Sequence, residues 1–224
     1  NMGKTEEIFE KQLQKCRVDY FDFYLFHNVC EMNIDAYLDP KYGTYDYLMA
    51  QKRNGRIRHL GFSTHGDIPT IRRFLEAYGK DMEFAQIELN YFDWNLQNAK
   101  GNLELLRQWN IPVWVMEPVR GGQLASLAPK DEARLKAARP DEGVPAWAFR
   151  FLQSLPDVTV TLSGMSNLQQ VKENIATYEQ AKPLNEQETA LVLSIADGMI
   201  RRTTVPCTAC RYCVSHCPRH LPIP

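Results

Sequence analysis

The sequence predicts an α/β fold in which parallel strands alternate with helices and close into a (β/α)8 barrel. Five short runs rich in β-branched and aromatic residues alternate with segments of helical periodicity, which favours a parallel sheet with helical crossovers. The open-sheet nucleotide binders usually carry G-x-G-x-x-G after their first strand, and the sequence contains neither that motif nor a G-x-x-x-x-G-K-S/T phosphate loop. A five-stranded parallel arc would also leave two unpaired apolar edges, which closure into a barrel removes.

Each expected strand is short, apolar and bounded by turn residues. β-Branched and aromatic side chains dominate these segments because such side chains pack well on a pleated surface. The expected strands cover residues 19–26, 57–62, 84–91, 112–117 and 158–162.

The segments before the first, third and fourth strands carry apolar residues at helical spacing. These stripes consist of Ile8, Phe9, Leu13 and Cys16, then of Ile68, Ile71, Leu75 and Tyr78, and then of Leu103, Leu106 and Trp109. We expect Gly79 to end the second of these helices as a C-terminal glycine cap.

Three more helices are expected in the C-terminal half. Pro145 suits the first turn of a helix that runs to about Leu155. Asn167 opens the next helix, and Asn185 with Glu188 resembles a capping box. The apolar residues expected on the helix after Asn167 are Leu168, Val171 and Ile175, and the last helix is expected to end at about Arg202.

The composition limits the classes of function. The chain has 224 residues, of which 44% are hydrophobic and 24% charged, enough for one sizeable core or for one domain with a small appendage. Its 26 Lys and Arg residues balance 27 Asp and Glu residues, whereas a generic nucleic-acid binder carries a basic excess. The longest apolar runs fall short of the roughly 18 residues of a membrane span, and the sequence does not open on a signal-peptide pattern. We therefore expect no nucleic-acid partner and no membrane association.

Four of the six cysteines lie within eleven residues. Such a cluster indicates metal or redox chemistry in a reducing, cytoplasmic location rather than a secreted disulfide framework. The spacing Cys207-x2-Cys210-x2-Cys213-x3-Cys217-Pro218 is that of bacterial ferredoxins, in which the fourth cysteine ligates the other of two clusters. It predicts that Cys207, Cys210 and Cys213 hold one 4Fe–4S cluster and that Cys217 serves a second. A zinc site is the alternative, although structural zinc normally takes two separated cysteine pairs.

The expected barrel is only partly covered by this sequence. A full barrel needs roughly 250 residues, whereas five of its eight strand–helix units are recognisable here. We expect residues 1–202 to form a partial (β/α)8 barrel and residues 203–224 to begin a ferredoxin-type 4Fe–4S domain. The sequence is therefore expected to be a portion of a longer polypeptide.

Five segments, taken in order, resemble the second half of an aldo-keto reductase. They read DYFDFYLFHNV, HLGFSTH, QIELNYFD, VWVMEPVRGGQL and LSGMSNLQQVKENI. The tail VPCTACRYCVSHCPRHLPIP is similar to the ferredoxin-like extension of an iron–sulfur subgroup of that family. The resemblance implies that the strands are the fourth to eighth of the barrel, and that the chemistry is hydride transfer between NADP or NAD and a carbonyl or alcohol. The family's catalytic Asp, Tyr and Lys belong to the first three strands, so we expect this chain alone to be inactive.

The resemblance also assigns residues to the reacting end of the cofactor. His27 lies at the C-terminal end of its strand, where barrel active sites are built, and a neutral imidazole there would hydrogen-bond the substrate carbonyl. A structural histidine at a strand end is the plainer alternative. Ser63 and Gln86 match the family's contacts to the nicotinamide carboxamide, with Thr64 and His65 as weaker candidates.

Two further segments are expected to hold the rest of the dinucleotide. Arg120 offers a cation to the diphosphate, beside two glycines that allow close backbone approach. The second segment comprises Ser163, Gly164, Gln170, Glu173 and Asn174, at a loop and helix start whose free N–H groups suit a phosphate. The resemblance assigns its last three residues to adenosine contacts. Gly164 and Gln170 stand where some family members place Lys and Arg around the 2′-phosphate, so NADP and NAD both remain open.

Three functions from different classes follow. We favour an aldo-keto-reductase-like oxidoreductase that acts on a small carbonyl or alcohol substrate and whose 4Fe–4S clusters pass electrons to or from a redox protein partner. The second is a regulatory protein that binds a nicotinamide cofactor without turnover. The third is an iron–sulfur electron carrier in which the barrel is a scaffold.

Overall fold

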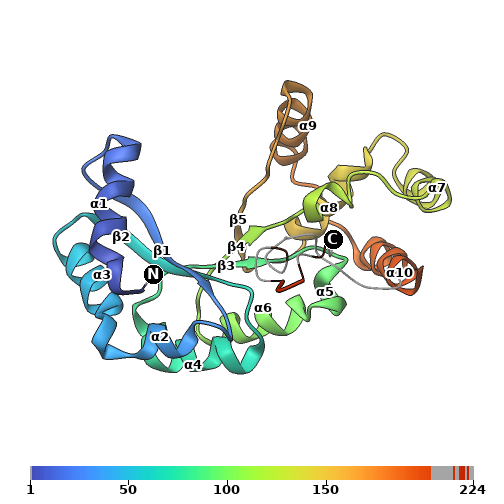
Figure 1. The fold of residues 1–224 in the computed structure, drawn as a ribbon. Helices are drawn as coiled ribbons and strands as arrows, with labels where there is room; N and C mark the ends of the chain where they lie inside the picture. Colours follow the sequence, from blue (N-terminus) through green and yellow to red (C-terminus); the bar gives the residue numbers. More distant parts are fainter. Residues whose placement is uncertain (1, 203–213, 215–216, 220, 222–224) are drawn as a thin grey trace. The chain divides into compact units, whose positions relative to one another are not determined.

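In a computed structural model, strands and helices alternate along the chain (Figure 1). The structure describes residues 2–202, Val214, residues 217–219 and Leu221. The chain divides into two compact units, which we call unit 1 (Asn1–Glu88 with Lys100–Trp114) and unit 2 (Leu89–Ala99 with Val115–Pro224).

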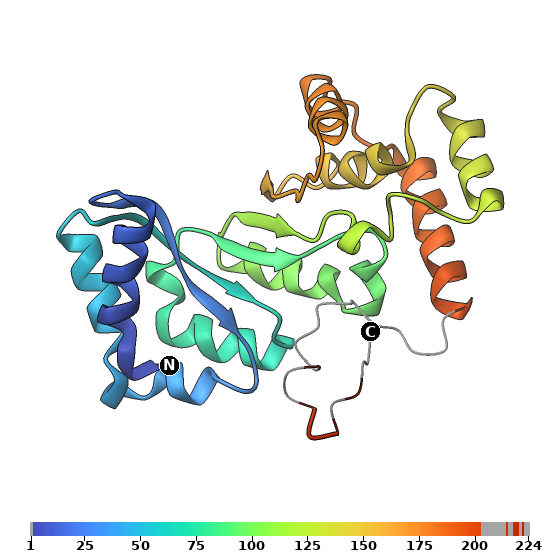
Figure 2. The same cartoon turned by 45° about the horizontal axis from the view of Figure 1, so that its top comes forward.

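Unit 1 is built of alternating helices and strands. Its elements are α1 (Thr5–Cys16), β1 (Phe21–Val29), α2 (Ile34–Leu38), α3 (Thr44–Arg53), β2 (Ile57–Thr64), α4 (Ile68–Tyr78), β3 (Ala85–Glu88), α6 (Ala99–Gln108) and the start of β4 (Val113–Met116). Helices α1 and α3 contact each other, as do α2 and α4 (Figures 1 and 2). The sequence pattern did not single out α2 and α3; α2 has only five residues, too few to show a helical period.

The described strands form a five-stranded sheet in the order β1-β2-β3-β4-β5, which confirms the expected α/β architecture. β1 pairs in parallel with β2, with Phe21 opposite Ile57, and β2 pairs in parallel with β3. All five expected strands are present. β3 is shorter than the expected 84–91. The chain leaves the strand because the side-chain oxygen of Asn90 accepts hydrogen bonds from the backbone N–H groups of Phe92 and Asp93 and so opens helix α5 (Asp93–Leu96).

Aromatic side chains fill the core of unit 1. Phe26, Phe62 and Phe74 are buried, and the ring centroid of Phe74 lies 5.4 Å from that of Phe26 and 4.8 Å from that of Phe62. Tilted and edge-to-face pairs at this spacing stabilise a core beyond the burial of their area. They hold α4 against β1 and β2, whose C-terminal ends carry the predicted His27 and Ser63.

Gly79 follows α4 for a reason other than the one expected. Its φ is −58°, a right-handed helical value that any residue adopts, so it is not a left-handed cap. A Cβ atom at Gly79 would lie 2.9 Å from the ring of Trp109. The close approach of this ring, and not the turn of the backbone, requires glycine.

Unit 2 contains α5, the end of β4 and the elements that follow β4. Its further elements are α7 (Pro129–Ala138), α8 (Val144–Gln153), β5 (Val158–Thr161), α9 (Leu168–Glu179) and α10 (Glu186–Arg202). Pro145 lies in the first turn of α8, and the Asn167 side chain caps α9, as predicted. The capping box is also confirmed, because Asn185 and Glu188 each accept a hydrogen bond from the other's backbone N–H.

Two expected helical stripes are only partly buried. On α1, Phe9 and Leu13 are buried, whereas Ile8 is 39% exposed. On α9, Leu168 is 67% and Ile175 52% exposed. α9 contacts α8 in unit 2. The buried residue of α9 is Thr177, which lies near the C-terminal end of the helix rather than on the expected stripe.

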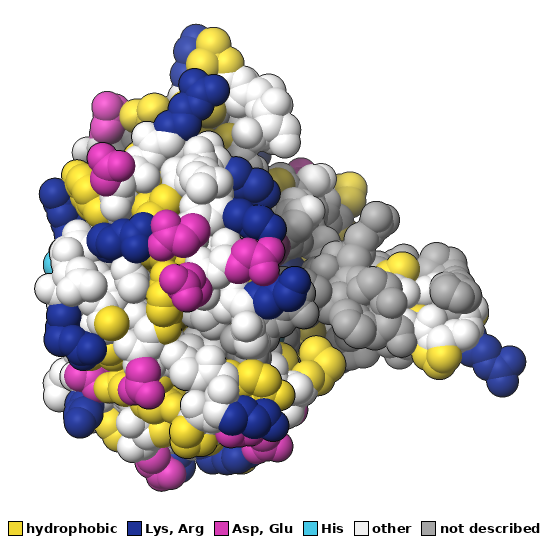
Figure 3. Space-filling model, turned by 60° about the vertical axis from the view of Figure 1, so that its left-hand side comes forward, with side chains coloured by type: hydrophobic (Ala, Val, Ile, Leu, Met, Phe, Trp, Pro, Cys, Tyr) yellow, Lys and Arg dark blue, Asp and Glu magenta, His cyan; other side chains and the backbone are white. Residues whose placement is uncertain are grey.

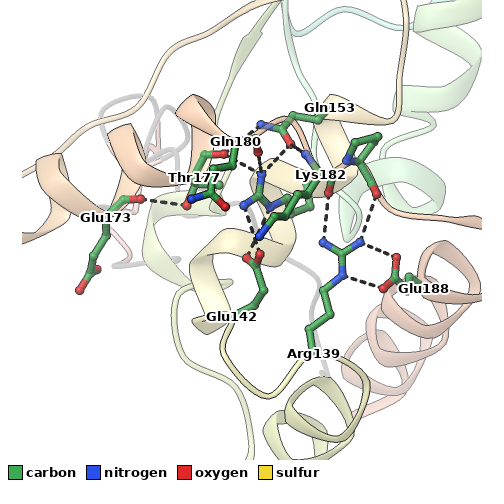
Figure 4. Close-up of polar contacts among 10 residues, drawn as sticks. Arg139, Glu142, Gln153, Glu173, Thr177, Gln180, Lys182 and Glu188 are labelled. Carbon is green, nitrogen blue, oxygen red and sulfur yellow. Dashed lines mark hydrogen bonds and ion pairs between the residues drawn. The ribbon is translucent and has the colours of Figure 1, made fainter.

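The C-terminal end of α9 is held by a buried arginine of α8. Arg150 is 3% exposed and donates through Nη1 to the carbonyl oxygens of Thr177 and Gln180 (Figure 4). Its Nη2 donates to a carboxylate oxygen of Glu142 at 3.1 Å. Carbonyls at a helix end lack intrahelical partners, so Arg150 supplies a donor to two of them, and the bond to the Thr177 carbonyl is buried.

A second arginine ties the start of α10 to the end of α7. Arg139 donates from Nε and Nη2 to the two carboxylate oxygens of Glu188, both at 2.6 Å (Figure 4). It also donates to the backbone carbonyls of Lys182 and Pro183 at 3.1 Å. A two-point pair of this kind fixes orientation as well as distance, so the connection before α10 is held in one geometry.

One face of the molecule mixes both signs of charge (Figure 3). On the face shown in Figure 3, Lys and Arg side chains alternate with Asp and Glu among apolar and neutral ones, in keeping with the net charge of −1. Within the described residues, every helix falls short of the length and hydropathy that a membrane-spanning segment requires.

The close packing of β2 on the strand next to it gives a first prediction. A Cβ atom at Gly61 would lie 2.4 Å from the Phe84 carbonyl oxygen and 2.6 Å from its ring. Because the obstacle is partly backbone, we expect Gly61→Ala to lower the free energy of unfolding by about 1–3 kcal/mol. Urea denaturation measures this change. Gly3→Ala is the control, since its Cβ would meet no atom within 4 Å, and equal unfolding midpoints for the two variants would contradict the described packing.

Candidate functional site

A cavity of about 650 Å³ opens in unit 2 at the C-terminal ends of β4 and β5. Its volume lies in the range of small-molecule sites, about 300–1,000 Å³. The wall combines the loop after β4, the loop after β5, the start of α9 and two residues of α8. The lining residues are Met116, Glu117, Pro118, Val119, Gly121, Gly122, Ala125, Pro145, Phe149, Leu162, Ser163, Gly164, Met165, Ser166, Gln170, Glu173 and Asn174.

One wall of this cavity brings together the second predicted segment. Ser163, Gly164, Gln170, Glu173 and Asn174 all line it. Asn174 Nδ2 donates to Ser163 Oγ at 3.2 Å, and Gln170 Oε1 accepts from the Ser166 N–H at 2.7 Å. The loop after β5 is thus bonded to the first turns of α9.

The opposite wall is the loop after β4, which has a left-handed backbone at several positions. The φ angles are 58° at Glu117, 51° at Arg120, 59° at Gly121 and 92° at Gly122. Residues with a Cβ atom avoid this region because the Cβ approaches a carbonyl oxygen. Glu117 makes two bonds within the loop, since its Oε2 accepts from the Gly121 N–H at 2.6 Å and its carbonyl accepts from the Arg120 N–H at 3.0 Å.

Arg120 lies in a different place from the one expected. Its side chain is 2% exposed and is not among the cavity-lining residues. Nε donates to Asp93 Oδ2 at 2.9 Å, Nη1 donates to Gln123 Oε1, and the guanidinium lies over the Phe92 ring, 4.2 Å from its centroid. The structure therefore places this cation in a buried ion pair behind the loop.

Two buried polar residues at the start of α5 complete this ion pair. Asp93 is fully buried and Asn90 likewise, and Asn90 Nδ2 donates both to Asp93 Oδ2 at 2.9 Å and to the Glu117 carbonyl at 3.0 Å. The sequence analysis did not single out either residue. Asn90 lies within the expected strand 84–91, and an Asn-x-x-Asp spacing signals at most a local helix cap, so the sequence carries no sign of the distant loop that these residues also support.

The cavity in unit 2 has an acidic lining. Glu117 and Glu173 contribute carboxylates, and the described residues that line it include neither Lys, Arg nor His. Apolar side chains such as Met116, Phe149 and Leu162 supply the remaining wall. The cavity therefore offers amide, hydroxyl and carboxylate groups to a ligand, together with the backbone of two glycine-containing loops.

In unit 1, His27 lies at the C-terminal end of β1, as expected. Its side chain is exposed and lines a cavity of about 750 Å³ together with Tyr24 and Tyr37. The Tyr37 hydroxyl donates to the His27 carbonyl at 2.7 Å. Burial raises the pKa of Tyr37 to about 12, so this hydroxyl remains protonated and able to donate. The backbone that presents the imidazole is therefore fixed.

Ser63 and Gln86 are brought together by the sheet. They are directly opposed partners in the parallel pairing of β2 and β3. Ser63 is buried, and its Oγ accepts from the Asn28 N–H at 2.8 Å, which ties it to the residue after His27. Thr64 Oγ1 donates instead to the Val29 carbonyl at 2.7 Å, which gives it a structural role.

The predicted iron ligands fall mostly outside the described residues. Cys207, Cys210 and Cys213 lie there, whereas Cys217 is partly exposed and its N–H donates to the Val214 carbonyl at 3.4 Å. Among the residues that the structure does describe, three or more His, Cys, Asp or Glu side chains do not converge on a common metal position.

Two curated relatives match the chain over most of its length. It is 25% identical to the NADH-specific methylglyoxal reductase of Escherichia coli (strain K12) over 215 residues, which are 84% of this chain and 63% of that protein. It is also 25% identical to an uncharacterized oxidoreductase of Bacillus subtilis (strain 168), covering 82% of this chain and 62% of that protein. The chain thus spans less than two thirds of the length of both relatives.

Solved structures share the fold. An aldo-keto reductase of Bacillus halodurans in its holo form has a TM-score of 0.67 at 22% identity, over 87% of this chain and 67% of that one. An aldo/keto reductase of Klebsiella pneumoniae in complex with NADP and acetate has a TM-score of 0.64 at 19% identity, over 84% of this chain and 62% of that one.

The model of the Aldo/keto reductase family matches residues 2–197. This match covers far more than half of the chain and contains both predicted cofactor segments and every strand. The chain belongs to the aldo/keto reductase family.

Proposed function

We propose that this chain forms part of an NAD-dependent oxidoreductase that transfers hydride between the cofactor and a small carbonyl or alcohol. The observation that carries the proposal is the cavity of unit 2, whose wall contains all five residues of the segment from Ser163 to Asn174 that we expected to bind a dinucleotide. The E. coli relative is named as a reductase of a small carbonyl compound, methylglyoxal, which supports the substrate class.

The residues present fit a dinucleotide. Gln170, Glu173 and Asn174 offer amide and carboxylate groups for the adenosine, on a helix whose first N–H groups favour an anion. The Gly121–Gly122 backbone, without Cβ atoms, allows a diphosphate to approach the opposite wall. Bound NADH supplies the hydride.

At the reacting end, the carboxamide is assigned to Ser63 and Gln86, which offer a hydroxyl and an amide from opposed positions of β2 and β3. His27 is assigned to the substrate, where a neutral imidazole would hydrogen-bond the carbonyl oxygen and orient it for hydride attack. The Tyr37 hydroxyl donates to the backbone carbonyl of His27, which restrains the backbone from which the imidazole extends.

The charge of the cavity favours NAD over NADP. A 2′-phosphate adds roughly two negative charges, and the described lining offers it two carboxylates and no cationic side chain. Gly164 and Gln170 occupy the positions at which the family resemblance places Lys and Arg. Repulsion by Glu173 and the lack of a charged donor both weaken binding of NADPH.

We therefore expect the chain to bind NADH at least about tenfold more tightly than NADPH, a difference of about 1.4 kcal/mol. Titration followed by the fluorescence of the reduced nicotinamide measures both dissociation constants. Gln170→Arg should narrow the difference by supplying a cation at the adenosine end.

Gln187→Arg is the matched control, because it makes the same charge change on an exposed position of α10 away from the cavity. It should leave the NADH preference unchanged. Tighter binding of NADPH by the unaltered chain would contradict the cofactor assignment, and failure to bind either dinucleotide would contradict the proposed function.

We propose in addition that the cysteine run holds an iron–sulfur cluster, as a second activity of the same chain. The proposal rests on the spacing Cys207-x2-Cys210-x2-Cys213-x3-Cys217-Pro218. Thiolate ligands of this kind suit the reducing cytoplasm, the compartment that the cysteine pattern predicts. The cluster would exchange electrons with a redox protein partner.

Anaerobic purification followed by iron and acid-labile sulfide analysis tests the cluster. We expect iron and sulfide in equal amounts in the purified chain, and their loss in Cys210→Ser. Cys16→Ser is the matched control, because Cys16 lies on α1, far outside the run in sequence, and should keep the iron. Stoichiometric zinc in place of iron would contradict the cluster and favour the zinc alternative.

A further inference from the structure

A buried polar group in unit 2 joins the start of α5 to the loop after β4. Asp93 accepts three hydrogen bonds, from Arg120 Nε at 2.9 Å, Asn90 Nδ2 at 2.9 Å and Gln97 Nε2 at 3.0 Å. Asp93 is fully buried and Arg120 is 2% exposed. A buried ion pair is retained at low cost only when its remaining polar atoms are also satisfied. Both oxygens of the Asp93 carboxylate have a partner, whereas Arg120 Nη2 is buried without a hydrogen-bond partner among the described residues.

The same group holds the two non-glycine residues of the loop that have a left-handed backbone. Arg120 is held by its side chain in the ion pair, and Glu117 by the bond from Asn90 Nδ2 to its carbonyl at 3.0 Å. Backbone strain of this kind persists only when the surrounding structure over-determines it. Asp93 and Asn90 supply that constraint from outside the loop.

The restrained loop is a wall of the candidate cofactor cavity. Glu117, Gly121 and Gly122 line it, whereas Asn90, Asp93 and the Arg120 side chain do not. Between the two restrained residues lie Pro118 and Val119, which also line the cavity. A change at Asp93 therefore reaches a ligand only through the shape of the loop.

We propose that Asp93 is a positioning residue for dinucleotide binding, and that Arg120 acts through Asp93 rather than by contacting the diphosphate. Their buried ion pair, with Asn90, keeps the left-handed loop from Glu117 to Gly122 in the shape that accepts the cofactor. This inference rests on the proposed function, since it concerns the same cavity.

The variant Asp93→Asn separates positioning from charge. It removes a negative charge near the cavity, so an electrostatic role alone predicts tighter binding of the anionic NADH. Positioning predicts the opposite sign, because the neutral amide loses the charge of the ion pair and offers one acceptor oxygen in place of two, so Arg120 is held more weakly and the loop relaxes. We expect the dissociation constant for NADH to rise at least about tenfold, since small misplacements of binding groups have effects of this size.

The variant Arg120→Lys separates positioning from direct contact. Lysine is itself a good phosphate ligand, so a direct contact to the diphosphate predicts nearly unchanged affinity. A lysine cannot reproduce the planar fork that bonds Asp93 and Gln123 together and lies over Phe92. We therefore expect NADH binding to weaken at least about fivefold.

The matched control is Glu188→Gln, which breaks the two-point pair with Arg139 elsewhere in unit 2. The Arg139 guanidinium holds the pKa of Glu188 below its usual range, so this pair also contributes to stability at neutral pH. Neither residue lines the cavity. Glu188→Gln should lower the unfolding midpoint and leave the affinity for NADH unchanged.

Amide hydrogen exchange of the unliganded chain measures how readily the hydrogen bonds of the loop open. It gives a result even if a variant binds NADH too weakly to titrate. The N–H groups of Gly122, Gln123 and Leu124 are hydrogen-bonded within the loop. Their exchange should accelerate in Asp93→Asn and Arg120→Lys but not in Glu188→Gln, where acceleration should be confined to α10.

The outcomes distinguish failure of the proposed function from failure of the positioning role. If the unaltered chain binds neither NADH nor NADPH, the proposed function fails, whatever the loop does. If it binds NADH, and Asp93→Asn binds equally or more tightly with unchanged loop exchange, the positioning role fails while the function stands. Should Asp93→Asn not fold, Arg120→Lys decides alone, and affinity retained in it would overturn the proposal.

Discussion

Parallel pairing of strands is the constraint on which the site depends. In a parallel sheet every strand ends at the same edge, so the loops that follow successive strands are collected there. The hydrogen bond from the Leu162 N–H to the Val115 carbonyl, at 2.9 Å, sets β5 beside β4 in this way. The loops after Met116 and after Leu162 consequently face a common cavity, although more than forty residues separate them in the chain. The sheet brings Ser63 opposite Gln86 by the same rule.

Strand positions were predictable because the expected strands are short runs rich in β-branched and aromatic residues between turn residues. The helix starts at Pro145, Asn167 and Asn185 were predictable too, since each depends on a local bond or a local ring constraint. The role of Gly79 was not, because it depends on Trp109, thirty residues away. Helices whose polar and apolar residues are poorly separated between two faces, such as α3 and α7, also left no clear pattern in the sequence.

In the candidate site too, the residues grouped by local sequence were predicted, and those whose surroundings come from distant segments were not. Ser163, Gly164, Gln170, Glu173 and Asn174 belong to one loop and one helix, so spacing along the chain was enough to group them. Arg120 was misplaced because its environment is made by residues from a distant segment. A cation beside two glycines suggests an anion site, but Asp93 takes up the guanidinium and turns it away from the cavity wall. Local sequence cannot reveal which of two possible anions a buried arginine will meet.

The central claim is that the cavity between the loops after β4 and β5 holds a dinucleotide. A crystal structure of the chain grown with NADH tests it most directly. The account predicts electron density for the adenosine beside Gln170, Glu173 and Asn174, with the diphosphate running toward Gly121 and Gly122. Density for the cofactor at another surface, with this cavity filled by ordered water, would contradict it.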